Sequence, residues 1–343
     1  MTNKFNSASL AAALALLLPY AAAADQAKTI YGADNRLDFF EAPADLRVLA
    51  DSVVSLWQGK QVSFSEGLAS LAHKNFGEAL NLCPGEKFRE QPIGAFCSGA
   101  LVGEDLVMTA GHCITDEAAC ADTKFVFGYA VKTSGGKAAT TVPAGEVYGC
   151  KRIVTRDLDK QPSGTVSTII SLLANILNKM GPDYALIQLD RKVTGHLPLP
   201  INRGAEPSKG TELLTIGHPV GLPLKVSGGA TVRSTSPKSY FITDIDAFGG
   251  NSGGPVFNAR TRLIEGILVL GGADFAKSPA GCTTAVTVAQ NKGLGTGVTR
   301  LSFLKAAIPE FPARKYAAEP VGLEVDAAAA RLEPLDFSAV RFD

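Results

Sequence analysis

The sequence predicts an all-β fold built from barrels, and its composition and apolar pattern both support this. The 343-residue chain contains 35 glycines and 19 prolines, which favour short strands and tight turns over long helices. From Ser52 onward, short apolar stretches alternate with turn signals, a spacing typical of β-barrels. Hydrophobic residues make up 46% of the chain, enough to bury a large core.

The clearest strand pair is a hairpin near residues 97–109. Apolar segments at 98–102 and 106–109 flank a Gly-Glu-Asp turn at 103–105. Further strands are expected at 125–131, 184–189, 213–217, 230–233, 240–242, 255–258 and 263–270.

Two segments depart from the strand pattern. Apolar residues recur at helical spacing over about 165–179, which predicts a helix inserted just before Asp183. We interpret it as a surface helix that docks one apolar face on a barrel. A lid beside the functional cleft is the alternative, because long inserted segments in compact domains are often functional. A second, C-terminal helix is expected over about 300–307.

The two ends of the chain are expected to lie outside the barrels. Residues 1–24 combine Lys4, an apolar stretch and small residues up to Ala24, the pattern of a secretory signal that is cleaved near Ala24. Residues 25–45 are interpreted as a pro-segment or an N-terminal strap, and 313–343 as a tail whose role stays open. We therefore expect a secreted protein, periplasmic or extracellular, without integral membrane association.

Charge and cysteine content narrow the function classes. Lysine plus arginine and aspartate plus glutamate both number 33, and this neutrality argues against a nucleic-acid partner, whose affinity depends on basic clusters. Six cysteines in an exported chain predict three disulfides, with a pairing that the sequence leaves open. No Cys-x-x-Cys spacing occurs, and no metal or other cofactor is expected.

Three residues in the order histidine, aspartate and serine carry the candidate chemistry. His112 lies in Thr-Ala-Gly-His-Cys, Asp183 opens an apolar strand, and Ser252 lies in the turn Gly-Asn-Ser-Gly-Gly-Pro. An imidazole can take the serine proton during attack, while a carboxylate fixes the imidazole tautomer. The backbone N–H groups of Gly250 and Ser252 are placed to stabilise the oxyanion of a tetrahedral intermediate. The spacing suits one barrel that carries His112 and Asp183 and a second that carries Ser252.

These motifs resemble those of trypsin-like serine proteases. The resemblance lies in residues 109–113, in 249–255 and in Asp-Tyr-Ala-Leu at 183–186. Asn251 before the serine, the opening at 30–36 and Gly-His-Pro at 217–219 resemble the bacterial glutamyl-endopeptidase-like branch.

The resemblance covers about residues 30–312 and has consequences for the fold. It implies two perpendicular six-stranded antiparallel β-barrels, chymotrypsin-like, with the site at their junction. The protease domain would span 46–312, with the first barrel at about 46–190 and the second at about 195–312. The resemblance also implies a disulfide between Cys97 and Cys113. Two more bonds would join Cys83, Cys120, Cys150 and Cys282 in an open pairing.

The function that the resemblance implies is a serine endopeptidase that hydrolyses peptide bonds through an acyl-enzyme. Its partners would be polypeptide substrates, and it is expected to be a monomer. The alternatives are a catalytically silent, protease-like binding protein and a glutamyl-specific endopeptidase.

The family pattern is broken at two places. Trypsin-like zymogens carry an aspartate before the serine, which receives a newly freed N-terminus. Asn251 stands at that position, so the site is expected to be preformed or gated by removal of residues 25–35. Glutamyl enzymes carry a pocket histidine on the strand that ends in Gly-Gly, and the corresponding segment 266–272 has none.

The substrate pocket is expected to contain Asp246, Val269 and Gly271. Asp246 lies six residues before Ser252, where trypsin-like enzymes carry an acidic pocket floor. A buried carboxylate in a narrow pocket attracts a cationic side chain, which predicts a preference for basic residues before the scissile bond. The alternative is that Asp246 turns away and accepts hydrogen bonds from loop backbone.

The remaining histidines are assigned no chemistry. His218 is interpreted as a structural loop residue, since no histidine or cysteine lies near it at metal-ligand spacing. His73 and His196 are expected to face solvent.

Overall fold

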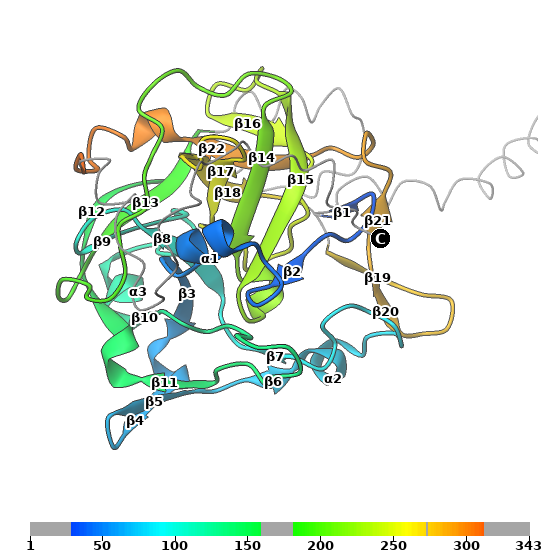
Figure 1. Ribbon diagram of the computed structural model, residues 1–343, viewed down its shortest axis with the longest axis horizontal. Coiled ribbons are helices and arrows are strands. Elements are labelled where there is room, and N and C mark those ends of the chain that lie inside the picture. The colour runs from blue at the N-terminus through cyan, green and yellow to red at the C-terminus, as the bar shows by residue number, and fades with distance from the viewer. Residues whose placement is uncertain (1–28, 159–180, 272–273, 312–343) are drawn as a thin grey trace, which may run out of the picture.

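The computed structural model describes residues 29–158, 181–271 and 274–311 (Figure 1). The expected signal segment at 1–24, the inserted helix at 165–179 and the tail at 313–343 lie outside the described residues. Within them, strands dominate and form two closed antiparallel barrels, as the sequence predicted. No helix in these ranges has the length and apolar character required to cross a membrane.

The first barrel is a closed sheet in which β10 pairs with both β12 and β3. The predicted hairpin is present, with Ala100 opposite Met108 across its two strands. Around the barrel the strands are β10 (Thr123–Val126), β12 (Val147–Leu158), β13 (Asp183–Leu189), β9 (Leu106–Thr109), β8 (Cys97–Leu101) and β3 (Val53–Gln58).

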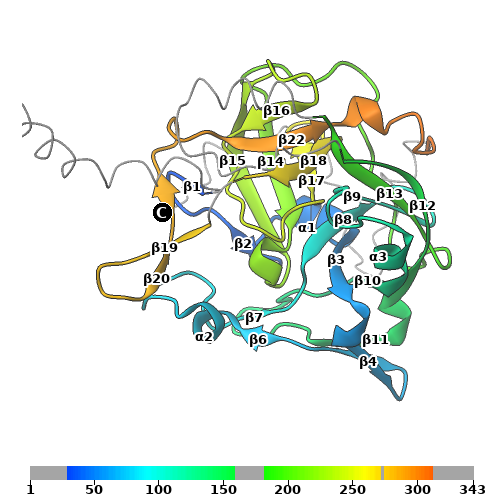
Figure 2. The ribbon, with the colours of Figure 1, turned by 180° about the vertical axis from the view of Figure 1, so that it is seen from behind.

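The second barrel closes where β14 pairs with β15 as well as with β17. Around it the strands are β14 (Glu212–Gly217), β17 (Pro255–Asn258), β18 (Ile264–Leu270), β22 (Thr296–Arg300), β16 (Tyr240–Thr243) and β15 (Lys225–Ser234). A short strand, β2 (Leu37–Asp38), extends the sheet at β15. Figure 2 shows the two barrels next to each other, seen from behind.

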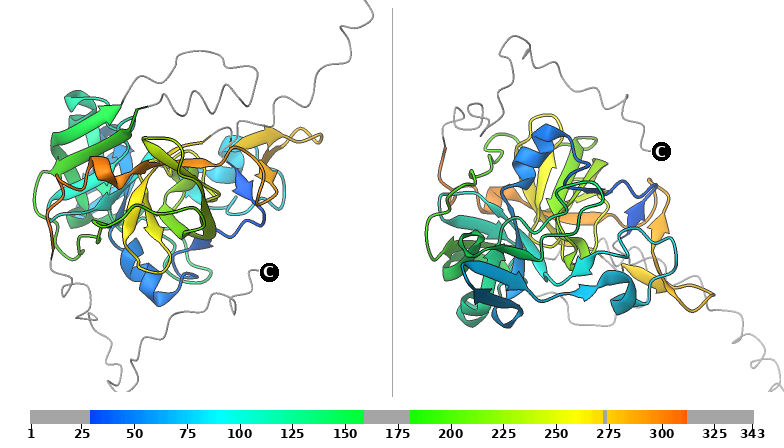
Figure 3. Two further views of the ribbon diagram at one scale, coloured as in Figure 1. Left: turned by 90° about the horizontal axis from the view of Figure 1, so that it is seen from above. Right: turned by 60° about the horizontal axis from the view of Figure 1, so that its bottom comes forward.

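Short helices and strands lie outside the two barrels (Figure 3). The helices are α1 (Ala44–Ala50), α2 (Phe76–Leu80), α3 (Glu117–Asp122), η1 (Gly59–Gln61), η2 (Ala144–Glu146), η3 (Pro219–Gly221) and η4 (Leu301–Phe303). The strands are β1 (Ile30–Tyr31), β4 (Val62–Ser65), β5 (Leu68–Leu71), β6 (Lys74–Asn75), β7 (Pro92–Ile93), β11 (Thr141–Pro143), β19 (Phe275–Lys277), β20 (Thr283–Ala285) and β21 (Thr287–Val288).

Three predicted elements differ in extent from those observed, and the strand expected at 230–233 already begins at Lys225. The strand expected at 125–131 ends at Val126, because the chain turns at Gly128, whose φ is 77°. The C-terminal helix expected over about 300–307 is the short 3₁₀ helix η4, followed by hydrogen-bonded turns.

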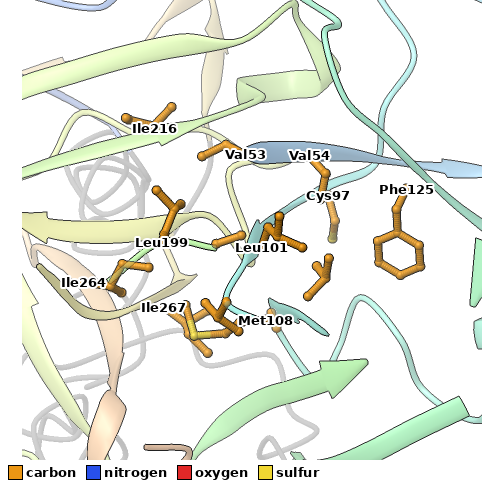
Figure 4. Packing of buried hydrophobic residues seen from close by; sticks show 14 of the residues in the cluster. Val53, Val54, Cys97, Leu101, Met108, Phe125, Leu199, Ile216, Ile264 and Ile267 are labelled. Carbon is orange, nitrogen blue, oxygen red and sulfur yellow. The ribbon is translucent and has the colours of Figure 1, made fainter. Parts of the chain in front are cut away.

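The largest apolar cluster spans both barrels and packs them together. Val54, Leu101 and Met108 of the first barrel and Ile216 and Ile267 of the second belong to the same buried cluster (Figure 4). Burial of such side chains contributes roughly 1.5–3 kcal/mol each. The two barrels therefore share one continuous hydrophobic core.

Three disulfides connect the six cysteines. Cys97 pairs with Cys113, as the resemblance implied, with the two Cα atoms 6.2 Å apart. The open pairings are Cys83 with Cys282 and Cys120 with Cys150. The Cys83–Cys282 bond joins residues 199 positions apart in the sequence, from loops of the two different barrels.

The segment from Thr29 to Asp38 pairs with two strands from the second half of the chain. β1 pairs in parallel with β21, and β2 pairs with β15. The Lys225 ammonium group donates to Asp38 Oδ1 at 2.6 Å and to Gln91 Oε1 at 2.7 Å, and both charged groups are buried. Burial lowers the pKa of Lys225 to about 8, although the Asp38 carboxylate opposes this shift. This segment is thus part of the folded domain in the present structure.

His196 does not face solvent, so that prediction was wrong. The segment between the barrels brings the imidazole between Asp51 and Glu146, whose carboxylates lie 2.8 and 2.7 Å from its two ring nitrogens. The ring also stacks on Phe127, with 4.2 Å between centroids. Burial opposes the charged imidazolium, but the hydrogen bonds to both carboxylates outweigh burial and raise the pKa of His196 to about 9.

This arrangement predicts a stability loss at alkaline pH. Because the pKa of His196 is raised, its stabilising contribution is complete below about pH 6.5 and is lost as the pH rises through about 9. We expect a loss of about 1–3 kcal/mol in the free energy of unfolding, since solvent partly screens the two carboxylates. Urea denaturation at pH 6 and pH 10 measures this loss, and His196→Gln is the control. Parallel pH dependences in the two proteins would contradict the assignment.

Candidate active site

The loop that carries His112 is held at both ends. It follows β9, and the Cys97–Cys113 disulfide ties its far end back to β8. β13 pairs with β9, with Ala185 opposite Thr109. This register places Asp183, the first residue of β13, beside the loop.

Asp183 contacts His112 with both carboxylate oxygens. The His112 backbone N–H donates to Oδ1 at 3.0 Å, and ring Nδ1 lies 2.6 Å from Oδ2. Because an ionised carboxylate only accepts hydrogen bonds, Nδ1 carries the proton and Nε2 is left as the basic nitrogen. Asp183 is buried, whereas His112 is partly exposed. The buried carboxylate therefore orients an imidazole ring that solvent can still reach.

Ser252 lies against the histidine loop from the second barrel. Its carbonyl accepts the Ser98 N–H at 2.9 Å and lies 3.6 Å from the Cys113 sulfur, next to His112 in the chain. A Cβ added at Gly253 would collide with the Ser98 carbonyl and the Thr109 hydroxyl. Only glycine at 253, which also has a φ of 88°, allows this close approach. The structure thus brings the three predicted residues to one place.

The Gly249–Gly250 segment before the serine has a defined backbone orientation. The Gly249 carbonyl accepts the Val220 N–H at 2.5 Å, and the Gly250 carbonyl accepts the Ser98 hydroxyl at 2.8 Å. Gly250 has a φ of 84°, and a Cβ there would lie 2.6 Å from the His218 carbonyl oxygen. Both carbonyl groups are thus engaged within the protein. The N–H groups that follow them can therefore face the place where an oxyanion would form.

The three predicted pocket residues have different environments. Asp246 is buried, and its oxygens accept the Tyr31 N–H at 2.7 Å and the Asn35 N–H at 3.4 Å. Burial raises the pKa of Asp246 to about 7, partly offset by the Tyr31 N–H. Val269 is buried in the core cluster, whereas Gly271 is exposed.

A metal site is not supported at this position. Within the described ranges, the group with metal-ligand proximity is Cys97, His112 and Cys113. Its two sulfurs form a disulfide and therefore provide no thiolate ligand. His218 is buried, donates Nδ1–H to the Leu222 carbonyl at 3.0 Å and has a pKa lowered by burial to about 3, which agrees with a neutral structural residue.

Sequence reasoning missed several residues that shape the site. Ser98 links the two barrels through its bonds to Gly250 and His218. Asp274 accepts the Gly249 N–H at 2.7 Å, and Thr299 donates to the Asp183 carbonyl at 2.8 Å. None of these residues lies in a recognisable motif. Their contacts join segments that are distant in the sequence, so no local pattern reveals them.

One comparison with known proteins finds a protein family. Residues 97–264 match the family model of the trypsin-like peptidase domain. The matched range includes His112, Asp183 and Ser252.

The other comparisons add context. The search of curated proteins finds no significant match. Among solved structures, the VesB protease of Vibrio cholerae aligns with 80% of this chain at 16% identity and a TM-score of 0.44. This chain spans 66% of the length of that protease.

Proposed function

We propose that the protein is a serine endopeptidase that cleaves polypeptides through an acyl-enzyme. Ser252 is the nucleophile, His112 the general base and then general acid, and Asp183 the group that orients the imidazole. The observation that carries the proposal is the pair of hydrogen bonds from His112 to Asp183, on the loop that Ser252 contacts. The match to a peptidase domain supports the same reaction class.

In the proposed reaction, His112 Nε2 takes the Ser252 hydroxyl proton as the oxygen attacks the peptide carbonyl. The oxyanion accepts hydrogen bonds from the N–H groups of Gly250 and Ser252, each worth about 3 kcal/mol of transition-state stabilisation. The imidazolium then gives its proton to the leaving amine, and water hydrolyses the acyl-enzyme by the reverse roles.

The residue preference of this enzyme is the second part of the proposal. Asp246 favours lysine or arginine before the scissile bond. A carboxylate has about four acceptor positions, so the two backbone contacts from the N-terminal segment do not exhaust its capacity. A glutamyl preference has less support, because residues 266–272 contain no histidine.

Export is proposed on two grounds. Three disulfides suit an oxidising compartment, and residues 1–24 have the pattern of a cleaved secretory signal. We propose that residues 46–312 then act as a monomeric protease domain, with 25–45 as an N-terminal strap.

One experiment tests the reaction and the preference together. The purified protein is expected to form a covalent adduct with a fluorophosphonate, mapped to Ser252 by mass spectrometry. Digestion of a denatured protein should give cleavage sites after lysine or arginine. Cuts after acidic or large apolar residues would defeat the basic preference alone. A protein that neither reacts nor cleaves would favour the alternative, a catalytically silent binding protein.

A further inference from the structure

A hairpin of the second barrel is fastened to a loop of the first. We call residues 274–285, which contain β19 and β20, the clamp hairpin. The Cys83–Cys282 disulfide joins it to the chain after α2, with the Cα atoms 5.0 Å apart. Thr283 adds two backbone bonds of 2.8 Å, to Cys83 and to Asn81. Figures 1 and 2 both show β20 beside the α2 region.

The clamp hairpin reaches the loop before Ser252. Asp274 lies at its base, where the Val286 N–H donates to the Asp274 carbonyl at 3.0 Å. Asp274 Oδ2 accepts the Gly249 N–H at 2.7 Å. The Phe275 ring packs on Phe248 with 4.8 Å between centroids. The hairpin therefore contacts two consecutive residues of the loop.

These contacts determine the direction of one backbone donor. In a trans peptide the C=O and N–H groups point in opposite directions. The Gly249 carbonyl is bound by the Val220 N–H, so the Gly250 N–H of the same peptide points to the other side. Asp274 accepts the N–H of Gly249. Gly249 is therefore fixed through both its N–H group and its carbonyl group. Val220 itself has a φ of 48°, a rare value for a β-branched residue that persists only where surrounding contacts enforce it.

We propose that Asp274 is a positioning residue for the oxyanion-binding loop. Its carboxylate fixes the Gly249 N–H and through it the Gly250 N–H, while the Cys83–Cys282 disulfide anchors the hairpin that carries it. This arrangement takes the place of the ion pair that an aspartate at position 251 would accept, since Asn251 is uncharged. The inference rests on the proposed function, because an oxyanion forms only if Ser252 attacks a carbonyl.

The test compares full-length Asp274→Ala and Asp274→Asn with Lys277→Ala. Lys277 lies on the same hairpin, is exposed, and contacts Thr283 rather than the loop. Asp274→Ala is expected to lower kcat roughly 10- to 100-fold with KM within about twofold, less than the loss of a direct donor. The fluorophosphonate labelling rate should fall in parallel. Asp274→Asn keeps an oxygen acceptor but loses the charge that strengthens the hydrogen bond, so kcat should lie two- to fivefold below wild type. Lys277→Ala should match wild type.

The outcomes separate this inference from the proposed function. A folded Asp274→Ala protein with wild-type kcat and labelling rate would overturn the role of Asp274 alone. If Asp274→Ala fails to fold, Asp274→Asn decides: a kcat two- to fivefold below wild type at unchanged KM supports the inference, and an unchanged kcat overturns it. A wild-type protein without hydrolysis or labelling would overturn both proposals.

Discussion

Replacing Ser252 with alanine is expected to lower kcat for peptide hydrolysis about 10⁶-fold. The methyl group of alanine cannot form the acyl-enzyme, so the remaining rate comes from substrate binding and from the oxyanion donors, which together contribute roughly 10³–10⁴-fold over water. Ser252 is buried against the histidine loop, and alanine removes one oxygen without adding volume. Fold and disulfides should therefore persist. Initial rates on a peptide chosen from the cleavage map measure the effect.

The control for this variant is Ser236→Ala. Ser236 is exposed on the second barrel, and its contacts are to Ser234 rather than to the site. It should cleave and label at the wild-type rate, so that the loss in Ser252→Ala is attributed to the hydroxyl at position 252 and not to a serine-to-alanine change in general. Proteolysis by Ser252→Ala within tenfold of wild type would remove Ser252 from the mechanism.

Asp183→Asn is expected to lower kcat about 10⁴-fold while leaving the fold intact. Asp183 accepts two hydrogen bonds from His112, one from the backbone and one from Nδ1–H. An asparagine NH₂ group facing Nδ1 would favour the other tautomer, in which Nε2 carries the proton and cannot accept one from Ser252. The side chains have nearly the same shape, so the buried position should tolerate the change. Stopped-flow or steady-state hydrolysis measures kcat, and thermal unfolding checks the fold.

A matched control for the aspartate is Asp122→Asn. Asp122 ends α3 on the exposed surface of the first barrel, so it shares the charge change without the contact to His112. It should retain wild-type kcat. If Asp183→Asn remains folded and loses less than tenfold in kcat, the imidazole is oriented by another group.

The elements that the sequence predicted well are those with local signals. The hairpin of β8 and β9 follows from two apolar segments around a Gly-Glu-Asp turn, and β13 and β17 follow from short apolar runs. The histidine and serine motifs are equally local. In the serine motif, positive φ angles and close backbone neighbours require glycine at 250 and 253, which explains why these positions are glycine.

The wrong prediction for His196 and the missed role of Asp274 both concern contacts between residues that are distant in the sequence. His196 has no motif, and its burial arises because Asp51 and Glu146 meet it from two other elements. Asp246, which stays a predicted pocket residue, also accepts backbone N–H groups from a segment 211 or more residues away, contacts that the sequence does not reveal. Asp274 was missed for the same reason, since the tertiary position of the clamp hairpin brings it to Gly249.

The Cys83–Cys282 bond encloses His112, Asp183 and Ser252 within one covalent ring of chain. A protease held at high concentration meets its own exposed loops as substrates. A nick anywhere inside this ring leaves the two pieces joined through sulfur, and the barrel halves that share the core stay associated. Autolysis within residues 83–282 is therefore visible only after reduction, and an apparently intact band on a non-reducing gel can contain cleaved molecules.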